Sequence, residues 1–245
     1  MNPTDFYDAL ADEYDLIFED WWASAEWQGT ILSRLLGPAP MSVLDCTCGI
    51  GTQALALATL GYDVTGSDVS EGAVARAREE ASRRDIDVKL SVADVRAVSG
   101  GPFDAVISCD NSLPHLLTDE DLVQALGCIR DCLKPGGLFL ASVRDYDALI
   151  RDQVPGMIPT IREADGRQRI VGQAWKWAED YRTVEINLFV LRKTDADWLS
   201  TVVTTTYRAL RRRELNDALT SAGFEAVQWP ADTGYYQPIV TARRS

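Results

Sequence analysis

The sequence predicts an α/β fold in which helices cover both faces of a doubly wound, mostly parallel sheet, with a small antiparallel sheet inserted late in the chain. After residue 40, short apolar runs alternate with segments of helical periodicity, which is typical of chains built from βαβ units. The run from Phe103 to Cys109 is continuously apolar, and this indicates a strand covered on both faces. From about Ile158, β-branched and aromatic residues alternate instead, which predicts antiparallel strands.

This pattern divides the chain into three parts. Residues 1–40 are expected to form an N-terminal helical lid, residues 41–155 and 211–245 the α/β core, and residues 156–210 an inserted antiparallel sheet. The inserted sheet would roof the carboxyl ends of the core strands, where doubly wound sheets bind their ligands. We expect helices at 4–36, 53–60, 71–84, 119–133 and 213–222, a turn at 134–137, and strands at 43–45, 63–68, 88–92, 103–109, 138–143, 169–177, 183–193, 198–210, 224–229 and 238–242.

Composition and charge restrict the partners of the protein. The chain has 245 residues, 46% hydrophobic and 25% charged, and is long enough to bury a substantial core. Its net charge of −13 argues against nucleic acid or an anionic membrane as the main partner, because either requires a basic face. No signal-peptide pattern opens the chain and no apolar run reaches membrane-spanning length, so we expect a cytoplasmic protein.

The cysteines do not form a recognisable metal or disulfide pattern. They are odd in number, and the spacing around Cys46 and Cys48 lacks the C-x-x-C form of zinc and redox motifs. We therefore expect buried, reduced thiols and no metal site. The five cysteines are Cys46, Cys48, Cys109, Cys128 and Cys132.

A glycine-bearing turn between residues 43 and 52 is the centre of the expected site. A short apolar strand ends in Asp45, and Gly49 and Gly51 follow where the backbone must bend and a ligand must come close. The next helix offers free N–H groups at its start to a polar ligand. Seventeen residues after Gly51, a second strand ends in Asp68, an acid well placed for a pair of ribose hydroxyls.

The spacing D-x-x-x-G-x-G from Asp45 to Gly51, taken with Asp68, resembles motif I and its partner acid in the class I methyltransferases that use S-adenosylmethionine (SAM). That resemblance implies a Rossmann-like sheet of seven strands, with SAM as methyl donor and S-adenosylhomocysteine (SAH) as product. The glycine turn would approach the methionine part of SAM, and Asp94 would accept a hydrogen bond from the adenine amino group. Among the N-terminal aromatic residues, Tyr14 is the best lid candidate. Cofactor contacts are expected from Tyr14, Asp45, Cys48, Gly49, Gly51, Asp68, Val69, Asp94, Val95 and Cys109.

Nearly the whole chain resembles one branch of that superfamily, the glycine, sarcosine and dimethylglycine N-methyltransferases. Residues 109–116, CDNSLPHL, are similar to the family's G-N-S-x-x-H-L run, and residues 143–147, VRDYD, are similar to its H-R-N-Y-D. Thr205-Thr206-Tyr207 falls where the family has a tyrosine strand facing the substrate, and residues 235–238 resemble its closing strand. Two positions depart from the family: Asp110 replaces a glycine and Asp145 replaces an asparagine.

The resemblance implies that Asn111 and Arg144 hold a substrate carboxylate and that Tyr207 orients the amine. Arginine suits this task because it is permanently charged and clamps a carboxylate with two parallel N–H bonds. The alternative without a functional role is an ordinary surface ion pair between Arg144 and Asp145 or Asp147. His115, the only histidine, is expected to position substrate or start a helix, because the amine can lose its proton to water before it attacks.

The favoured function is methyl transfer from SAM to the nitrogen of a small amino acid or related amine. Three alternatives stay open: methylation of another acceptor, such as a natural-product oxygen or carbon; a SAM-binding sensor or scaffold without transfer activity; and metalloid methylation, which needs three convergent thiols. The sequence leaves the acceptor, the number of methyl groups and the oligomeric state undetermined.

Overall fold

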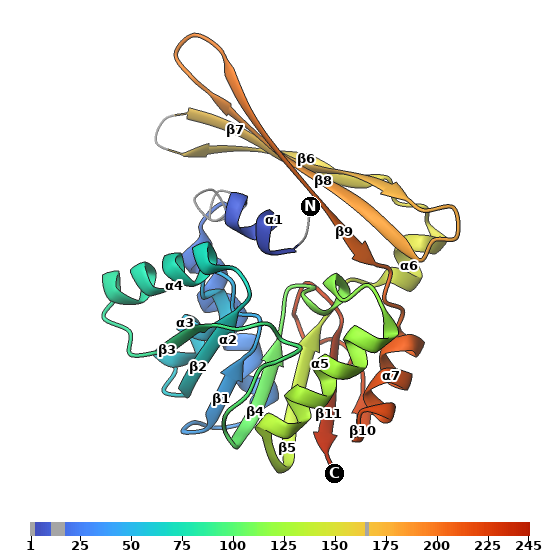
Figure 1. The fold of residues 1–245 in the computed structure, drawn as a ribbon. Coiled ribbons are helices and arrows are strands. Elements are labelled where there is room, and N and C mark those ends of the chain that lie inside the picture. The colour runs from blue at the N-terminus through green and yellow to red at the C-terminus, as the bar shows by residue number, and fades with distance from the viewer. Residues whose placement is uncertain (1–2, 11–17, 165–166) are drawn as a thin grey trace.

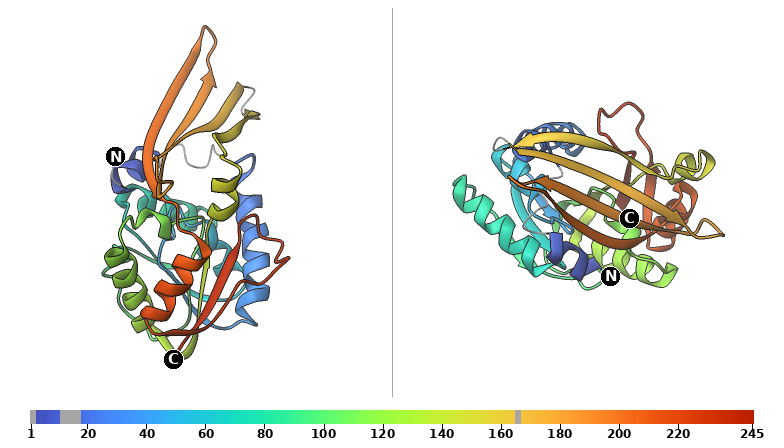
Figure 2. Two further views of the ribbon diagram at one scale, coloured as in Figure 1. Left: turned by 90° about the vertical axis from the view of Figure 1, so that its right-hand side faces the viewer. Right: turned by 90° about the horizontal axis from the view of Figure 1, so that it is seen from above.

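The computed structural model describes residues 3–10, 18–164 and 167–245, and it contains the two sheets that the sequence predicts. Seven strands form the larger sheet and four form a second sheet beyond its carboxyl edge (Figure 1). The views in Figure 2 show that the four-stranded sheet extends across that edge as a separate layer. In the described part of the chain, no helix is long and apolar enough to cross a membrane.

The larger sheet has the strand order β10-β11-β5-β4-β1-β2-β3. Neighbouring strands from β5 to β3 are all parallel, whereas β11 runs antiparallel to both β5 and β10. The order reverses between β1 and β4, and this switch point is where such sheets bind ligands. The strands are β1 (Ser42–Asp45), β2 (Asp63–Asp68), β3 (Lys89–Val92), β4 (Phe103–Ser108), β5 (Leu133–Ser142), β10 (Phe224–Gln228) and β11 (Ile239–Arg244).

Helices cover both faces of this sheet because successive side chains of each strand point to opposite sides. Leu44 packs with the cluster that contains α5 (Asp119–Cys132) and α7 (Arg212–Ser221). Val43 packs with the cluster that contains α2 (Trp21–Leu36) and α3 (Thr52–Thr59). The helix α4 (Glu71–Arg83) follows β2 and lies near the β3 edge (Figure 1).

The N-terminal segment is two helices rather than the single one expected over 4–36. Asp20 caps α2 by accepting a hydrogen bond from the Ala23 N–H, so a new helix begins at Trp21. Ile31, Leu32 and Leu36 of α2 are buried against the large sheet, so this helix is part of the core layer and does not act as a lid. The helix α1 (Pro3–Leu10) instead lies between the two sheets (Figure 1).

The second sheet is fully antiparallel, with the order β6-β7-β8-β9. Its strands are β6 (Gly156–Ala164), β7 (Arg167–Trp177), β8 (Thr183–Lys193) and β9 (Trp198–Arg208), and β6 was not among the expected strands. The short helix α6 (Tyr146–Arg151) was missed as well. The expected turn at 134–137 lies inside β5, where the pairing with β4 shifts between Phe103 and Ala105.

Candidate active site

A cavity of about 360 Å³ lies at the carboxyl ends of β1, β2, β3 and β4. The sheet reverses its strand order here, so loops from both halves diverge and leave room for a ligand. The lining residues come from α1, the glycine turn, the ends of the four strands, and the segment that includes the single turn η2 (Leu113–His115). They include Thr4, Tyr7, Cys48, Gly49, Gln53, Asp68, Val69, Asp94, Val95, Asp110, Ser112 and His115.

The glycine turn places its two glycines in different roles. Gly49 lines the cavity with φ +53°, and a Cβ built there would meet no protein atom within 4 Å. Gly51 has φ +93°, and a Cβ there would lie 2.9 Å from the Leu55 side chain and 3.3 Å from the Cβ of Ala77. Gly49 therefore keeps the cavity open, whereas Gly51 lets the turn enter α3 against α4.

Asp68 ends β2 and lines the cavity. One carboxylate oxygen accepts the Gly49 N–H at 2.9 Å, and the other accepts the Ser70 N–H at 3.0 Å. Burial raises the pKa of Asp68, while these two backbone hydrogen bonds oppose the shift. Each oxygen keeps a lone pair for a further donor, so Asp68 fixes the turn and remains able to bind a pair of hydroxyls.

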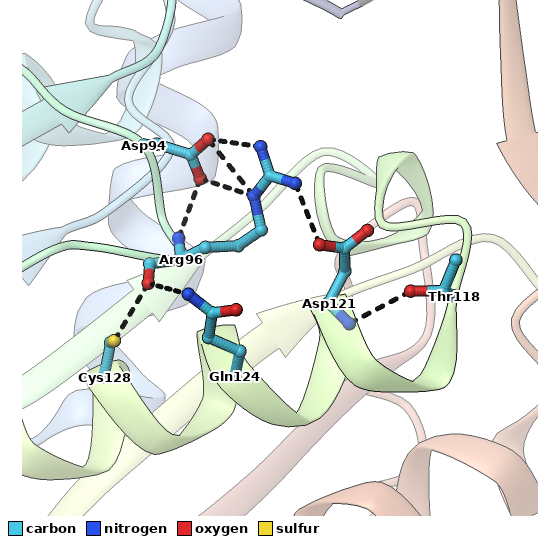
Figure 3. Close-up of polar contacts among 6 residues, drawn as sticks. All are labelled: Asp94, Arg96, Thr118, Asp121, Gln124 and Cys128. Atoms are coloured by element: carbon cyan, nitrogen blue, oxygen red, sulfur yellow. Dashed lines mark hydrogen bonds and ion pairs between the residues drawn. The ribbon is translucent and has the colours of Figure 1, made fainter.

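Asp94 also lines the cavity, but its carboxylate already has a partner (Figure 3). It accepts hydrogen bonds from Nε and Nη2 of Arg96, at 3.0 and 2.6 Å, and Arg96 Nη1 continues to Asp121 of α5 at 2.8 Å. The side-chain hydrogen bond from Arg96 lowers the pKa of Asp94. Both Arg96 and Asp121 line the cavity as well. This part of the lining is therefore a hydrogen-bonded chain of three residues, Asp94, Arg96 and Asp121, of which the sequence predicted only Asp94.

Three of the residues expected to contact the cofactor do not line the cavity. Asp45 is fully buried beneath the turn, and burial raises its pKa to about 8, so it holds a proton at neutral pH. Gly51 faces α3 and α4, and Cys109 is buried within the core cluster of α2 and α3. These residues shape the site from below. Tyr14 lies outside the described residues.

His115 lies at one end of the cavity between two tyrosines. Its Nε2 is 3.0 Å from the Tyr7 hydroxyl of α1, and its ring centroid is 4.1 Å from that of Tyr207 on β9. Burial, aided by the positive charge of Arg144, lowers the pKa of His115 to about 3. The imidazole is therefore neutral at physiological pH and a weak proton acceptor. Tyr7 was not predicted as a site residue; only the aromatic richness of the N-terminus hinted at it.

Arg144 follows the end of β5 and has no acidic partner among the described residues. Its Nη2 donates to Gln173 at 3.3 Å, and its guanidinium lies over Trp175 and Tyr207, 5.0 and 5.4 Å from the ring centroids. Its Nη1 is buried without a hydrogen-bond partner. Asp145 and Asp147, the alternative partners, bind Arg212 instead.

Asn111 holds Arg144 in place and is not open to a substrate in this arrangement. Its side-chain oxygen accepts the Arg144 N–H at 3.0 Å, and its amide nitrogen donates to the Tyr146 hydroxyl at 3.0 Å. The side chain is buried and, like those of Arg144 and Tyr207, does not line the cavity. The expectation that Asn111 contacts the substrate carboxylate is therefore corrected: both ends of its amide serve protein groups.

Asp110 follows β4 and lines the cavity. It has φ +58°, and its carboxylate accepts hydrogen bonds from Tyr235 at 2.8 Å, Tyr236 at 2.5 Å and Gln53 at 2.8 Å. Its departure from the glycine of the resembled family was the available signal.

The cavity suits SAM by the chemistry of its lining. Gly49 leaves open space beside the turn, Asp68 offers lone pairs, and Val69 and Val95 supply apolar walls for a flat ring.

No group of three His, Cys, Asp or Glu side chains that could hold a metal ion occurs within the described ranges. The cysteines are free, and burial raises the pKa of Cys46, Cys48 and Cys109.

Comparisons with known proteins agree with this geometry. Residues 43–137 match a family described as a methyltransferase domain. The glycine/sarcosine N-methyltransferase of Parasynechococcus marenigrum is 35% identical over 150 residues, which cover 60% of this chain and 53% of that protein. The chain thus spans about half the length of the curated glycine/sarcosine N-methyltransferases it matches.

Two solved structures share the fold over almost the whole chain. The CcbJ methyltransferase of Streptomyces caelestis has a TM-score of 0.81 at 21% identity and covers 100% of this chain and 99% of its own. The SAM-bound CalS10 of Micromonospora echinaspora, an amino pentose methyltransferase, has a TM-score of 0.72 at 21% identity and covers 92% of each chain.

Residues 43–137 thus match a methyltransferase domain, and the whole chain is similar in fold to solved SAM-dependent methyltransferases, which supports SAM as the cofactor. Within that class, the chain resembles the glycine/sarcosine N-methyltransferase family.

Proposed function

We propose that the protein transfers a methyl group from SAM to the nitrogen of a small amino acid or a related small-molecule amine. The observation that carries the proposal is Arg144. Its guanidinium lies over two aromatic rings, one buried N–H lacks a partner, and none of the described residues supplies it with a carboxylate, so it is the complement of a substrate carboxylate.

Two further buried polar atoms near Arg144 support an acceptor site at this place. His115 Nδ1 and Thr205 Oγ1 both lack hydrogen-bond partners. Thr205 is two residues from Tyr207 on the same side of β9, and the Tyr207 ring lies against both His115 and Arg144. Buried polar groups almost always have hydrogen-bond partners in folded proteins. Three buried atoms without partners therefore suit a polar ligand that binds beneath the second sheet.

Each residue has a defined task in this proposal. Asp68 and the glycine turn would hold SAM, which supplies an activated methyl carbon. Arg144 binds the carboxylate of the acceptor, and Asn111 and Gln173 fix the backbone and side chain of Arg144. Tyr207 and neutral His115 orient the acceptor, while α1 and the second sheet exclude water. Alignment of the two reactants can lower the barrier by about 7 kcal/mol or more.

The test compares an acid with its amide in the wild-type protein and in Arg144→Lys. Lysine keeps the charge but loses the two-pronged geometry, so kcat/KM for the amino acid should fall about ten- to a thousandfold, or roughly 1.4–4 kcal/mol. The amino acid amide should be a poor substrate for the wild type and should lose little more in the variant. SAM affinity should be unchanged. Arg151→Lys, at an arginine whose side chain is 70% exposed, is the matched control.

Two outcomes would contradict the proposal. Equal losses for acid and amide would mean that Arg144 binds no carboxylate and that the acceptor is not an amino acid. Intact SAM binding without turnover of glycine, sarcosine, dimethylglycine or related amines would favour a sensor or an acceptor of another chemical class.

A further inference from the structure

The carboxylate of Asp110 lies where the cavity meets a group of aromatic side chains. Asp110 and Gln53 both line the cavity. Tyr235 and Tyr236, from the loop before β11, hold the same Asp110 oxygen, and their rings stack with centroids 4.9 Å apart. Tyr236, whose hydroxyl donates to the Asp110 carboxylate, is 54% exposed and so extends to the protein surface.

No cation compensates Asp110 among the residues that the structure describes. Its three donors are neutral, and a carboxylate has about four acceptor positions, so one remains for a group in the cavity. The other titratable groups facing it are Asp45 from β1, Cys109 from β4 and the two tyrosines. Burial raises the pKa of Asp110, and the three hydrogen bonds oppose the shift.

We propose that Asp110 accepts the proton that the acceptor amine must lose before it attacks the methyl carbon, and that Tyr236 links Asp110 to solvent. The inference rests on the proposed amine acceptor and adds a proton acceptor to that site. An amine that enters a closed cavity as an ammonium ion is no nucleophile, since its lone pair is bound to the proton.

The geometry leaves Asp110 as the group for this task. His115 also lines the cavity, but it lies next to the Arg144 cation, and its pKa of about 3 makes it a weak base. Asp68 is fixed by the Gly49 and Ser70 N–H groups and is assigned to the ribose hydroxyls of SAM. Asp94 is paired with Arg96.

The step balances as follows. The N–H bond of the ammonium breaks, the proton moves to Asp110, and the electron pair stays on nitrogen. The neutral amine forms the new N–C bond while the carbon–sulfur bond breaks, and sulfur keeps that electron pair as a neutral thioether. The methylated amine leaves as an ammonium ion. Asp110 returns its proton to solvent past the Tyr236 hydroxyl, so one proton is released for each methyl group transferred.

The test is the pH profile of Asp110→Asn. Asparagine tolerates the positive φ of this position and keeps an oxygen for the tyrosines, so the variant should fold. At pH 7, kcat/KM for the amine should fall about a hundredfold or more, and it should recover about tenfold for each pH unit until the free amine is deprotonated. The wild type should level off at lower pH. Tyr236→Phe should show a smaller loss, and Asp195→Asn, at a 93% exposed acid, should show none.

A second measurement does not depend on turnover. In protein carrying carbon-13 at the aspartate carboxyl groups, the signal that Asp110→Asn removes should titrate above the ordinary aspartate value of about 3.9. A midpoint at or below that value would overturn the proposal. A loss of kcat/KM in Asp110→Asn that is equal at all pH values would also overturn it. So would weaker binding of SAM with an unchanged pH profile, because Asp110 would then bind the ammonium group of the cofactor. Failure of the wild type on every amine would instead overturn the proposed function.

Discussion

Charged side chains at three strand ends define the chemistry of the site at the scale of single residues. Asp68 ends β2, Asp110 follows β4, and Arg144 follows β5. Burying a charge is costly unless it is hydrogen-bonded or paired. Asp68 is stabilised by backbone N–H groups and Asp110 by neutral side chains, whereas Arg144 keeps an unsatisfied N–H. The two acids accept hydrogen bonds from neutral donors, whereas the arginine has a buried N–H without a partner, which is why we propose it as the ligand-binding group.

Removing the Asp68 carboxylate should weaken cofactor binding. Asp68→Ala would take away a charged acceptor at the cavity wall, which costs roughly 1.5–3 kcal/mol. The affinity for SAM and SAH should therefore fall about ten- to a hundredfold in calorimetric titrations. Asp63→Ala, at the exposed start of the same strand, is the control. Unchanged binding by a folded Asp68→Ala protein would place the cofactor site elsewhere.

At the scale of elements, α1 joins the two sheets around the cavity. Phe6 packs into the second sheet with Val171 and Leu188. On the other side, Asp8 accepts hydrogen bonds from the Ser70 hydroxyl and the Gly72 N–H at the start of α4, at 2.5 and 3.1 Å. A helix of eight residues has little stability alone, so these contacts hold α1 and its Tyr7 over the cavity.

The two glycines of the turn between β1 and α3 should rank in opposite order for stability and for SAM binding when each is replaced by alanine. A left-handed backbone conformation costs a non-glycine residue about 1–2 kcal/mol, so Gly49→Ala and Gly51→Ala should both destabilise the fold. Gly51→Ala adds a clash with Leu55 and Ala77 and should lower the free energy of unfolding more. Gly49→Ala places its methyl group in open space at the cavity and should weaken SAM binding more. Urea unfolding and calorimetry on both variants would measure this, and the reverse ranking would contradict the assignment.

At the scale of the whole molecule, buried acids make stability depend on pH. The pKa of Asp45 is raised to about 8 from 3.8, so between these values the native state holds a proton that the unfolded state releases. The free energy of unfolding contributed by Asp45 therefore falls as pH rises from about 4 to 8. Below pH 4 the opposite trend applies to Asp104, whose pKa is lowered to about 2 by its hydrogen bond from Lys134.

Asp45→Asn should remove that dependence, because the amide resembles the protonated acid and does not titrate. Urea unfolding at several pH values should show a flatter profile between pH 4 and 8, and the variant should gain stability relative to the wild type as pH rises. Parallel profiles for the two proteins would mean that Asp45 is ionised in the folded state.

The sequence alone determined the α/β class, the position of the inserted sheet and the glycine turn with Asp68. These depend on local signals: the hydrophobic period sets strand or helix, and a turn that needs positive φ needs glycine. The seven-stranded sheet and the cofactor were expected from the resemblance that these motifs carry; the structure confirms the sheet and the comparisons support the cofactor.

Only the tertiary structure decided which charged residues face the cavity and which already have partners. Asn111 was expected to bind a ligand, yet Arg144 and Tyr146 occupy both ends of its amide, and Asp94 lines the cavity while paired with Arg96. Tyr7 and Arg96 gave little local signal and line the site. Local sequence fixes where the chain turns, but a polar side chain is free for a ligand only if no other segment supplies its partner. That partner can be far away in the sequence. Tyr236 and Asp110, for example, become hydrogen-bond partners only when the chain folds.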